Sequence, residues 1–343
     1  MSSQPITSAI LLVGGFGTRL QPLTFSTPKP MLSVGGIPFT EHQIIKAREA
    51  GITEIVLATS FLAEVYEPYF GDGESFGIKI SYAVEKVALG TGGAIAHAAT
   101  RLKNSGPVVV FNGDVLSGHD LQRQMHLHLS KNSDVTLYLT EVPDARAYGV
   151  VEMDGSKIRT FNEKMENPPS KIINAGCYIF NRDIIESIPS GKVVSVERET
   201  FPDLLVQGKS LNGYIDNSYW LDIGTPSALL QATRDLISGE VQSAAFDALI
   251  ATGDFEHRDD SLISKSATVS PDVELGGGTF VGHGAVIEPG VKLFGTFIGM
   301  QAAVGSQAEL MDTFVADGSK IPGGFVASKQ FFGYTSSISP ITP

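Results

Sequence analysis

A six-residue repeat runs through the C-terminal part of the chain and limits what that part can fold into. Aliphatic residues recur at every sixth position and, after a slip of one residue, resume the same spacing. These positions are Ile263, Val269, Leu275, Val281, Ile287 and Leu293, and then Ile298, Val304 and Leu310. Repeats of this length are typical of a left-handed parallel β-helix, in which each side of a triangular coil is one repeat. The spacing therefore predicts a short β-helix of roughly three coils.

Upstream of the repeat, apolar runs alternate with helical patterns. The expected strands are 10–13, 54–58, 78–84, 108–111 and 135–142, and the expected helices are 39–50, 61–70, 93–102 and 121–129. This alternation indicates an α/β fold with a Rossmann-like, mostly parallel sheet, in which ligands bind beyond the carboxyl ends of the strands. We therefore expect an α/β domain over residues 1–240, an irregular acidic linker over 241–262, and the β-helix with its tail over 263–343.

The charge balance excludes several classes of partner. The chain has 37 acidic and 25 basic residues, a formal net charge of −12, so neither a nucleic acid nor an anionic membrane is an expected partner. A single cysteine, Cys177, excludes an intramolecular disulfide, and no apolar run approaches the roughly 18 residues of a membrane span. The first residues lack the basic segment of a signal peptide. We expect a cytoplasmic protein that holds any anion through a local cluster of donors.

Such a cluster follows the first expected strand. The segment reads Leu12-Val-Gly-Gly-Phe-Gly-Thr-Arg-Leu-Gln-Pro-Leu-Thr24 and is followed by Thr27-Pro-Lys-Pro30. Its three glycines allow backbone N–H groups to approach phosphate oxygens closely, and Arg19 and Lys29 add fixed positive charge. A Gly-Gly-x-Gly run alone also occurs in ordinary turns, but the added bases favour a phosphate site. The segment matches neither the Gly-Lys-Ser/Thr phosphate loop nor the dinucleotide fingerprint.

This segment resembles the signature of the nucleotide-sugar pyrophosphorylases, which join a sugar 1-phosphate to a nucleoside triphosphate and release pyrophosphate. Further blocks resemble that family in the family's order over most of residues 8–235. They are Glu85-Lys-Val-Ala-Leu-Gly-Thr-Gly-Gly-Ala94, Phe111-Asn-Gly-Asp-Val115, Tyr148-Gly-Val, Phe161-Asn-Glu-Lys164, Ile173-Asn-Ala-Gly176 and Trp220-Leu-Asp-Ile-Gly-Thr-Pro226. Asn162 departs from the residue that the family often has before Glu-Lys. The resemblance implies a nucleotidyltransferase domain over residues 1–240.

The resemblance also implies a role for each block. Arg19 and Lys29 would meet the triphosphate and Lys164 the sugar phosphate, and these three are the expected catalytic residues. The expected nucleotide-binding residues are Leu12, Gly14, Gly15, Gly17, Thr18, Glu85, Gly90, Thr91 and Asn112. The expected sugar-phosphate-binding residues are Gly149, Glu163 and Asn174. Asp114 and Asp222 would hold Mg²⁺, an ion that binds through one or two carboxylates, phosphate oxygens and water.

The chemistry of the reaction agrees with these residue types. The attacking phosphate oxygen is already ionised at neutral pH, so no general base is needed and catalysis becomes the alignment of two anions. A carboxylate such as Glu85 can accept both N1–H and N2–H₂ of guanine, whereas uracil and thymine offer one N–H between two carbonyls. This favours GTP, although a backbone contact from Gly90 could decide the base instead.

Two rival functions stay open. The Pro-Lys-Pro form and the repeat tail most resemble family members that make GDP-mannose from mannose 1-phosphate and GTP. The first rival is a thymidylyl-, uridylyl- or adenylyltransferase acting on glucose 1-phosphate or another sugar 1-phosphate. The second is a non-catalytic regulatory subunit that binds a nucleotide sugar. We further expect a homo-oligomer assembled through the β-helix, and we expect His126 and His128 to be solvent-exposed surface residues.

Overall fold

The computed structural model describes residues 4–15, 17–60, 62–333 and 338–340. It divides into two compact units. Unit 1 comprises Met1–Gly15 and Gln43–Trp220, and unit 2 comprises Phe16–His42 and Leu221–Pro343. The chain passes between them within helix α1 (Phe39–Glu49) and near strand β13 (Trp220–Asp222). No helix in the described ranges is both long and apolar enough to cross a membrane.

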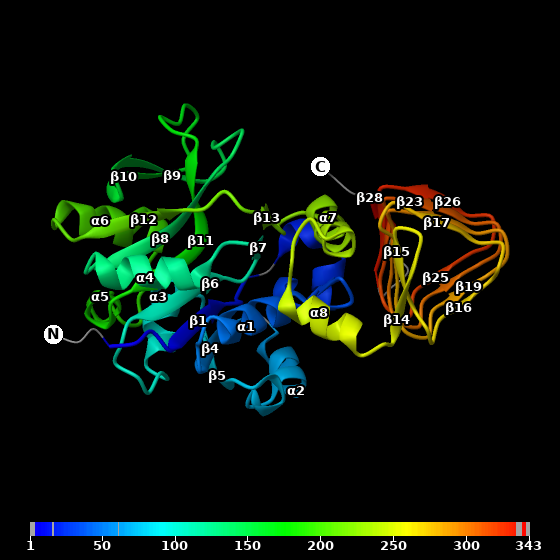
Figure 1. Ribbon diagram of the computed structural model, residues 1–343, viewed down its shortest axis with the longest axis horizontal. Coiled ribbons are helices and arrows are strands. Elements are labelled where there is room, and N and C mark those ends of the chain that lie inside the picture. The colour runs from blue at the N-terminus through cyan, green and yellow to red at the C-terminus, as the bar shows by residue number, and fades with distance from the viewer. Residues whose placement is uncertain (1–3, 16, 61, 334–337, 341–343) are drawn as a thin grey trace. The chain divides into compact units, whose positions relative to one another are not determined.

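A nine-stranded sheet forms the centre of unit 1, with the strand order β5-β4-β1-β6-β11-β8-β12-β10-β9 (Figure 1). Its strands are β1 (Ser8–Leu12), β4 (Glu54–Thr59), β5 (Lys79–Val84), β6 (Val108–Asn112), β8 (Val135–Glu141), β9 (Gly149–Asp154), β10 (Lys157–Glu163), β11 (Ile172–Phe180) and β12 (Leu211–Ile215). The short β7 (Val115–Ser117) follows the turn after β6. All five strands expected in the first 142 residues are present.

The expectation of a mostly parallel sheet holds for only part of it. Strands β5, β4, β1 and β6 are parallel, but β11 runs antiparallel to both β6 and β8, and β10 is antiparallel to β9 and β12. Parallel neighbours need a crossover of a dozen or more residues. The connection from β9 to β10 is instead a turn around Gly155, whose φ of 60° suits glycine. The sheet is therefore mixed.

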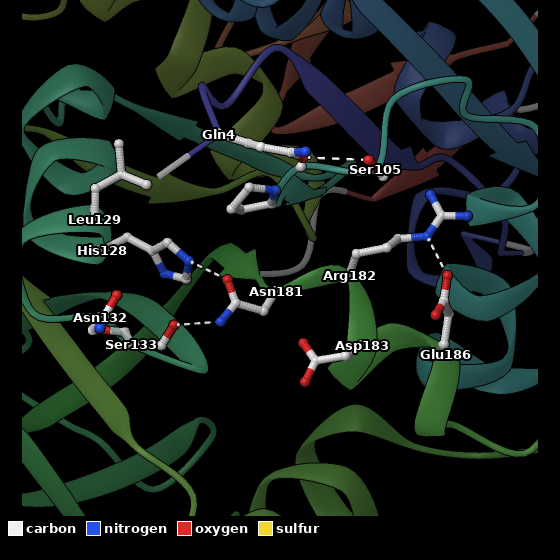
Figure 2. Close-up of a pocket in the computed structure, with 12 residues that line it drawn as sticks. Gln4, Ser105, His128, Leu129, Asn132, Ser133, Asn181, Arg182, Asp183 and Glu186 are labelled. Carbon is white, nitrogen blue, oxygen red and sulfur yellow. Dashed lines mark hydrogen bonds and ion pairs between the residues drawn. The ribbon is translucent and has the colours of Figure 1, made fainter. Parts of the chain in front are cut away.

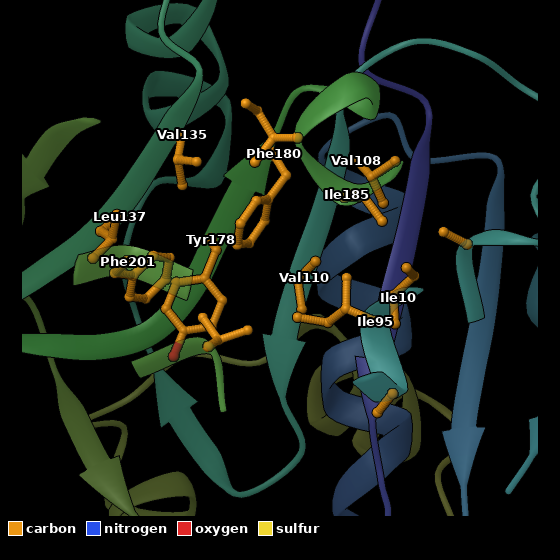
Figure 3. Packing of buried hydrophobic residues seen from close by; sticks show 14 of the residues in the cluster. Ile10, Ile95, Val108, Val110, Val135, Leu137, Tyr178, Phe180, Ile185 and Phe201 are labelled. Atoms are coloured by element: carbon orange, nitrogen blue, oxygen red, sulfur yellow. The ribbon is translucent and has the colours of Figure 1, made fainter. Parts of the chain in front are cut away.

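Helices cover the sheet of unit 1 and close its core. They are α2 (Tyr66–Phe70), α3 (Gly90–Ala99), α4 (Leu121–Ser130), α5 (Arg182–Ser187) and α6 (Phe201–Val206), with a π-helical turn at Val196–Thr200. Figure 3 shows Ile10 and Val110 of the sheet against Ile95 of α3, with Tyr178 beside Phe201. These side chains are all buried, so the core fixes the strands whose ends carry the site.

Unit 2 contains helices α7 (Pro226–Ser238) and α8 (Ala244–Ala251) and the short strands β2 (Ser33–Val34) and β3 (Ile37–Pro38). Helix α7 begins where Thr225 Oγ1 accepts a hydrogen bond from the N–H of Ala228 at 3.3 Å, with proline at the first helical position. It ends at Gly239, whose φ is 79°. The stretch 241–262, expected to be an irregular linker, instead holds α8 and strand β14 (Phe255–Arg258).

Residues beyond 260 form short parallel strands on three faces, consistent with a β-helix (Figure 1). One face is β15 (Ser261–Ser264), β18 (Phe280–Val281), β21 (Phe297–Ile298), β24 (Phe314–Val315) and β27 (Gln330–Phe332). The second is β16 (Thr268–Val269), β19 (Val286–Ile287), β22 (Ala303–Val304) and β25 (Lys320–Ile321). The third is β17 (Glu274–Gly276), β20 (Lys292–Phe294), β23 (Glu309–Met311) and β26 (Val326–Ser328).

The coils extend further than the spacing alone predicts. Each face has at least four strands rather than about three, because the slip before Ile298 recurs before Val315 and hides the later repeats. In register, Val281 pairs with Ile298, and Ile298 pairs with Val315. All three side chains are buried in the interior of the coils. The aliphatic positions of the repeat therefore form the core, as expected.

A row of aromatic rings joins the coils to the rest of unit 2. The ring centroids of Phe280 and Phe297 lie 4.9 Å apart, and those of Phe297 and Phe314 lie 4.4 Å apart. A Cβ added at Gly36 would lie 2.6 Å from Phe280 Cζ, so the backbone after β2 packs directly on this row. Arg234 of α7 donates to the carbonyl of Gly295 at 2.6 Å. The coils and residues 17–42 are thus parts of one packed body.

Replacing Phe297 with alanine should lower the free energy of unfolding of unit 2 by about 3–5 kcal/mol, because it empties the space between two stacked rings. Urea unfolding would measure the change. Phe25→Ala is the matched control: Phe25 is 63% exposed, and its removal should change the free energy by no more than about 0.5 kcal/mol. Equal losses in the two variants would contradict the packing role of Phe297.

Candidate functional site

The carboxyl ends of β1, β4 and β6 lie side by side in unit 1. Leu12 pairs with Ala58 on one side and Asn112 on the other, which brings the glycine-rich segment beside the Asn112-Gly-Asp block. The N–H of Gly113 donates to the carbonyl of Leu12 at 2.9 Å, and a Cβ on Gly113 would overlap that carbonyl oxygen. Gly14 and Gly15 follow on the exposed edge, and a Cβ on Gly14 would lie 2.8 Å from Ser60 Oγ. Glycine is therefore required where the two backbones meet.

The expected base-binding loop starts at the end of β5 and runs into the N-terminus of α3. The N–H of Glu85 donates to the carbonyl of Thr59 at 2.8 Å, and Glu85 Oε2 accepts from the N–H of Leu89 at 3.0 Å. Burial raises the pKa of the Glu85 carboxyl above its ordinary value, and the Leu89 hydrogen bond opposes that rise. Gly90 has a φ of 69°, and a Cβ there would lie 2.6 Å from the carbonyl oxygen of Val194. One carboxylate oxygen of Glu85 therefore braces its own loop.

Tyr178 links the predicted nucleotide and sugar residues of unit 1. Its buried hydroxyl accepts from Asn174 Nδ2 at 2.8 Å and from Asn112 Nδ2 at 3.4 Å. The same hydroxyl donates to Glu197 Oε1 at 3.5 Å, and Glu197 Oε2 accepts from Thr91 Oγ1 at 2.8 Å. Three residues predicted from separate blocks are therefore held by one hydrogen-bonded network.

Neither Tyr178 nor Glu197 is predicted from the sequence. Tyr178 lies within an apolar strand and is typical of a core residue, so nothing in its surroundings marks its hydroxyl as functional. Glu197 lies in the π-helical turn Val196–Thr200, and such turns are frequent at functional sites. No sequence pattern distinguishes this turn from an ordinary helix start.

The expected sugar-phosphate residues meet at the end of the β9–β10 hairpin. Gly149 pairs with Glu163, and a Cβ on Gly149 would lie 2.9 Å from Glu163 Oε2. Lys164 Nζ lies 3.8 Å from Glu163 Oε1, and the N–H of Lys164 donates to the carbonyl of Tyr148 at 3.1 Å. The backbone of Lys164 has a φ of 54°, an uncommon value outside glycine that is typical of constrained sites. The lysine is therefore held at a fixed place beside the carboxylate.

Burial raises the pKa of the Glu163 carboxyl above its ordinary value, and the nearby Glu197 adds to this rise. Lys164 and Arg198 act in the opposite direction without cancelling it. The charged form of Glu163 is therefore less favourable in the folded protein than in water. A raised carboxyl pKa of this kind is common at functional sites.

Unit 2 brings together the other predicted residues. Gly17 has a φ of 55° and accepts a hydrogen bond from Thr24 Oγ1 at 2.9 Å, and a Cβ there would lie 3.0 Å from Lys29 Cβ. Thr18 and Arg19 form the short 3₁₀ turn that follows, and both are exposed. Lys29 is half-buried.

Asp222 lies with these basic groups. Lys29 Nζ is 4.0 Å from Asp222 Oδ1. A Cβ added at Gly224 would meet both the Arg19 guanidinium, at 2.5 Å from Nη2, and Asp222 Oδ1, at 2.9 Å. The structure thus places Gly17, Arg19, Lys29 and Asp222 in one cluster of unit 2. Asp114, in the turn after β6, belongs to unit 1 with Glu85, Asn112 and Glu163.

A cavity of about 480 Å³ lies elsewhere on unit 1 (Figure 2). It is lined by residues around the start of β6 and the end of β11, among them Pro107, His128, Asn181 and Arg182. Because Phe180 pairs with Val108, this is the opposite end of the sheet from Asn112. None of the predicted site residues lines it. This cavity is therefore not the predicted site.

The prediction that His128 lies on the surface is wrong. Its side chain is 1% exposed and bonds Thr136 Oγ1 at 2.9 Å and Asn181 Oδ1 at 3.2 Å (Figure 2 shows the second bond). Burial lowers the pKa of His128 to about 4, so its ring is neutral near pH 7. A two-residue spacing on a helix turns the two rings to different faces, so His126 is exposed while His128 faces the sheet.

Comparison with known proteins shows similarity to a single family of transferases. It matches the nucleotidyl transferase family over residues 8–239. It is 47% identical to the mannose-1-phosphate guanylyltransferase of Mycobacterium tuberculosis, over 84% of this chain and 79% of that protein. It is 35% identical to the mannose-1-phosphate guanyltransferase of Neurospora crassa, over 76% and 72%. The crystal structure of HddC from Yersinia pseudotuberculosis complexed with GMP-PN is 28% identical, with a TM-score of 0.58, and covers 67% of this chain and 99% of that chain.

Glu163→Gln should make the protein more stable than the wild type near pH 7. A carboxyl whose folded pKa is raised contributes stability that is fully present below its unfolded pKa and is lost as pH rises through the folded pKa. The glutamine variant does not undergo that loss, so its advantage should be present at pH 7 and absent at pH 4. Urea unfolding at both pH values would measure it. Glu199→Gln, an exposed residue of the same turn as Glu197, should show no comparable gain; a Glu163→Gln variant without an advantage at pH 7 would contradict the assignment.

Proposed function

The chain belongs to the nucleotidyl transferase family, and we propose that it joins mannose 1-phosphate to GTP, forming GDP-mannose and pyrophosphate. The observation that carries this proposal is the 47% identity to a mannose-1-phosphate guanylyltransferase over 84% of the chain. The grouping of predicted residues within each unit supports it. A structural relative that binds the guanine nucleotide analogue GMP-PN also supports the choice of base.

The reaction is a single displacement at phosphorus. An oxygen of the mannose 1-phosphate attacks the α-phosphorus of GTP and forms a new P–O bond. The bond from that phosphorus to the oxygen shared with the β-phosphate breaks, and pyrophosphate leaves with its electron pair. The nucleophile is already ionised, so the protein need not remove a proton, and its contribution is alignment and neutralisation of charge.

The predicted catalytic residues suit that task. Arg19 and Lys29 would bind the triphosphate, since both are cationic and follow the glycine-rich segment. Lys164 would bind the phosphate of the sugar, because its backbone is constrained and its exposed ammonium group lies beside Glu163. The backbone N–H groups at Gly14, Gly15, Gly17 and Thr18 would bind phosphate oxygens, and Leu12, at the end of β1, would contact the nucleoside. Together these donors offset anionic charge in a protein whose own net charge is −12.

Guanine recognition would involve the loop that begins at Glu85. Glu85 Oε2 accepts from the N–H of Leu89, which leaves Oε1 as the acceptor for N1–H or N2–H₂ of the base. Gly90 and Thr91 open helix α3, and their backbone N–H groups would be the donors, because those of Gly92 and Gly93 already donate to the carbonyl of Val194. For the sugar, Gly149 permits close approach, and Glu163 and Asn174 would bind hydroxyl groups. The raised pKa of Glu163 agrees with a carboxylate that gains donors only when substrate binds.

We propose that Asp114 and Asp222 would supply carboxylate oxygens to a divalent metal ion, and that this ion is Mg²⁺. Among the described residues, no group of three or more His, Cys, Asp or Glu side chains could enclose an ion. This suits Mg²⁺, which keeps several waters and binds through one or two carboxylates together with substrate phosphates. When bound, the ion would supply positive charge against the triphosphate.

We also propose that the coils wind left-handed, as six-residue repeats typically do, and that the chain self-associates through them. The third face of the coils carries two exposed apolar side chains on neighbouring strands, Phe294 (39% exposed) and Met311 (51% exposed). Val326 on β26 is also exposed (69%), but it pairs with Glu309, two residues away from the row of Phe294 and Met311. The adjacent pair of exposed apolar side chains, Phe294 and Met311, favours association with another surface.

A substrate panel tests the proposed function. The purified protein would be incubated with Mg²⁺, one of GTP, ATP, UTP or dTTP, and either mannose 1-phosphate or glucose 1-phosphate, and pyrophosphate release would be measured. We expect the fastest release with GTP and mannose 1-phosphate. Faster release with another pair would support the rival transferase. Binding of GDP-mannose without turnover of any pair would support the regulatory subunit.

Asp114→Asn should lower kcat by about 10²-fold or more, because it removes one charged oxygen donor for the metal. Asp120→Asn is the matched control. Asp120 caps α4 by accepting from the N–H of Arg123 at 3.0 Å, and asparagine caps a helix equally well. Its kcat should therefore stay within about twofold of the wild type. Unchanged kcat in Asp114→Asn would contradict the metal assignment.

A double variant, Phe294→Glu with Met311→Glu, should reduce self-association, because it places like charges on the proposed contact face. Sedimentation velocity would report the mass of the assembly, and circular dichroism would report the fold. Arg159→Glu with Lys157→Glu, on exposed positions of unit 1, is the control and should leave the mass unchanged. An assembly of unchanged mass in the first double variant would exclude this face.

A further inference from the structure

Gln43 is a buried side chain that bonds both ends of the turn carrying Asp114. It lies on α1 and is 5% exposed. Its Nε2 group donates to the carbonyl of Asn112 at 2.8 Å and to the carbonyl of Val115 at 3.2 Å. These two carbonyls precede and follow Gly113 and Asp114. Since both hydrogens sit on one nitrogen, the two carbonyl oxygens are held close together and the turn between them is fixed.

The same turn is fixed on its other side by the backbone of β1. Gly113 donates to the carbonyl of Leu12 at 2.9 Å and approaches it too closely for any Cβ. Leu12 therefore positions Gly113, while Gln43 of α1 positions Asn112 and Val115 on either side of the turn. Asp114 is the other residue of this turn, and its position follows from these backbone contacts.

A second contact repeats the pattern one helical turn along α1. Lys46 Nζ donates to the carbonyl of Ser117 at 2.6 Å and to Ser117 Oγ at 3.1 Å. Residues three apart on a helix lie on the same face, so Gln43 and Lys46 bond β6 and β7 at successive positions. Helix α1 thereby forms a rigid support for the segment 112–117.

The other half of the Gln43 amide shows what this support costs. Gln43 Oε1 is buried and has no hydrogen-bond partner in the described part of the chain. A buried unpaired acceptor costs about 1–3 kcal/mol. A glutamine chosen for stability alone would have both ends of its amide satisfied, so the orientation of this amide is set by the two carbonyls at Nε2.

We propose that Gln43 is a positioning residue that sets the geometry of Asp114 for the metal ion. This proposal rests on the proposed function, because it assigns to Asp114 the metal role given above. Gln43 itself touches neither substrate nor metal; it acts through the backbone of the turn. Supports of this kind typically change metal affinity by 10- to 100-fold when they are removed.

Gln124 provides a matched control within the same unit. It is also buried, and its Nε2 group also donates to two backbone carbonyls, those of Thr136 and Cys177, both at 3.3 Å. These carbonyls lie within β8 and β11 and do not flank Asp114. Gln43→Met and Gln124→Met therefore remove the same chemical group from equally buried places, and only the first releases the Asp114 turn.

The test measures binding of Mn²⁺ to the full chain in the presence of GTP, by electron paramagnetic resonance, with urea unfolding as a check on each variant. We expect Gln43→Met to weaken Mn²⁺ binding by about tenfold or more, and Gln124→Met to change it by less than about twofold. In turnover, Gln43→Met should raise the Mn²⁺ concentration for half-maximal rate by a similar factor, with KM for mannose 1-phosphate nearly unchanged. If Gln43→Met does not fold, Gln43→Asn against Gln124→Asn takes its place, since the shorter amide cannot reach both carbonyls.

Equal Mn²⁺ affinities in the Gln43 and Gln124 variants would overturn the inference, whatever the turnover. A wild-type protein that binds Mn²⁺ with GTP but turns over no substrate pair would overturn the proposed function and leave the binding comparison to decide on Gln43. A KM for mannose 1-phosphate that rises as much as the metal requirement would also count against a specific role at Asp114, because it would indicate a general loosening of the site.

Discussion

The close contact between the ends of β1 and β6 is the constraint on which the site of unit 1 depends. Gly113 donates to the Leu12 carbonyl and lies too near it for a side chain, so the glycine-rich segment and the Asp114 turn begin from one fixed point. Below this contact, β1 and β6 pair in parallel from Ser8–Val108 to Leu12–Asn112, so the sheet fixes its position. The buried core beneath then determines where both loops can lie.

Each unit carries charged groups among the predicted site residues. The carboxyl groups of Glu85 and Glu163 both have raised pKa values, chiefly because they are partly buried. In unit 2, Arg19 and Lys29 lie with Asp222 rather than alone. Perturbed carboxyl groups of this kind are typical of functional sites. Within unit 1, the uncharged hydroxyl of Tyr178 links Asn112, Asn174 and Glu197.

Much of the fold follows from the sequence, for reasons that particular residues make clear. The strands from β1 to β8 are short apolar runs bounded by helices, and the coil interior is marked by aliphatic residues at a fixed spacing. The antiparallel half of the sheet was not predictable, because β11 is as apolar as a parallel strand and its direction depends on distant pairing. The later coils are not predicted, because the spacing between Leu310 and Val315 is five residues instead of six. For the site, motifs identify residues that are polar and close in sequence to glycine, whereas Tyr178 and Gln43 lie in patterns that look like ordinary core.

Residues 17–42 pack with the coils and with α7 and α8. Arg19 and Lys29 belong to the same body as the aromatic row at Phe280, although they are far from it in sequence. A gene shortened at residue 240 would encode the nine-stranded sheet intact but leave Gly36 facing water where Phe280 had covered it. A tail exchanged between relatives must therefore preserve the surface around Gly36. Amino-acid changes around Gly36 should covary with changes around Phe280.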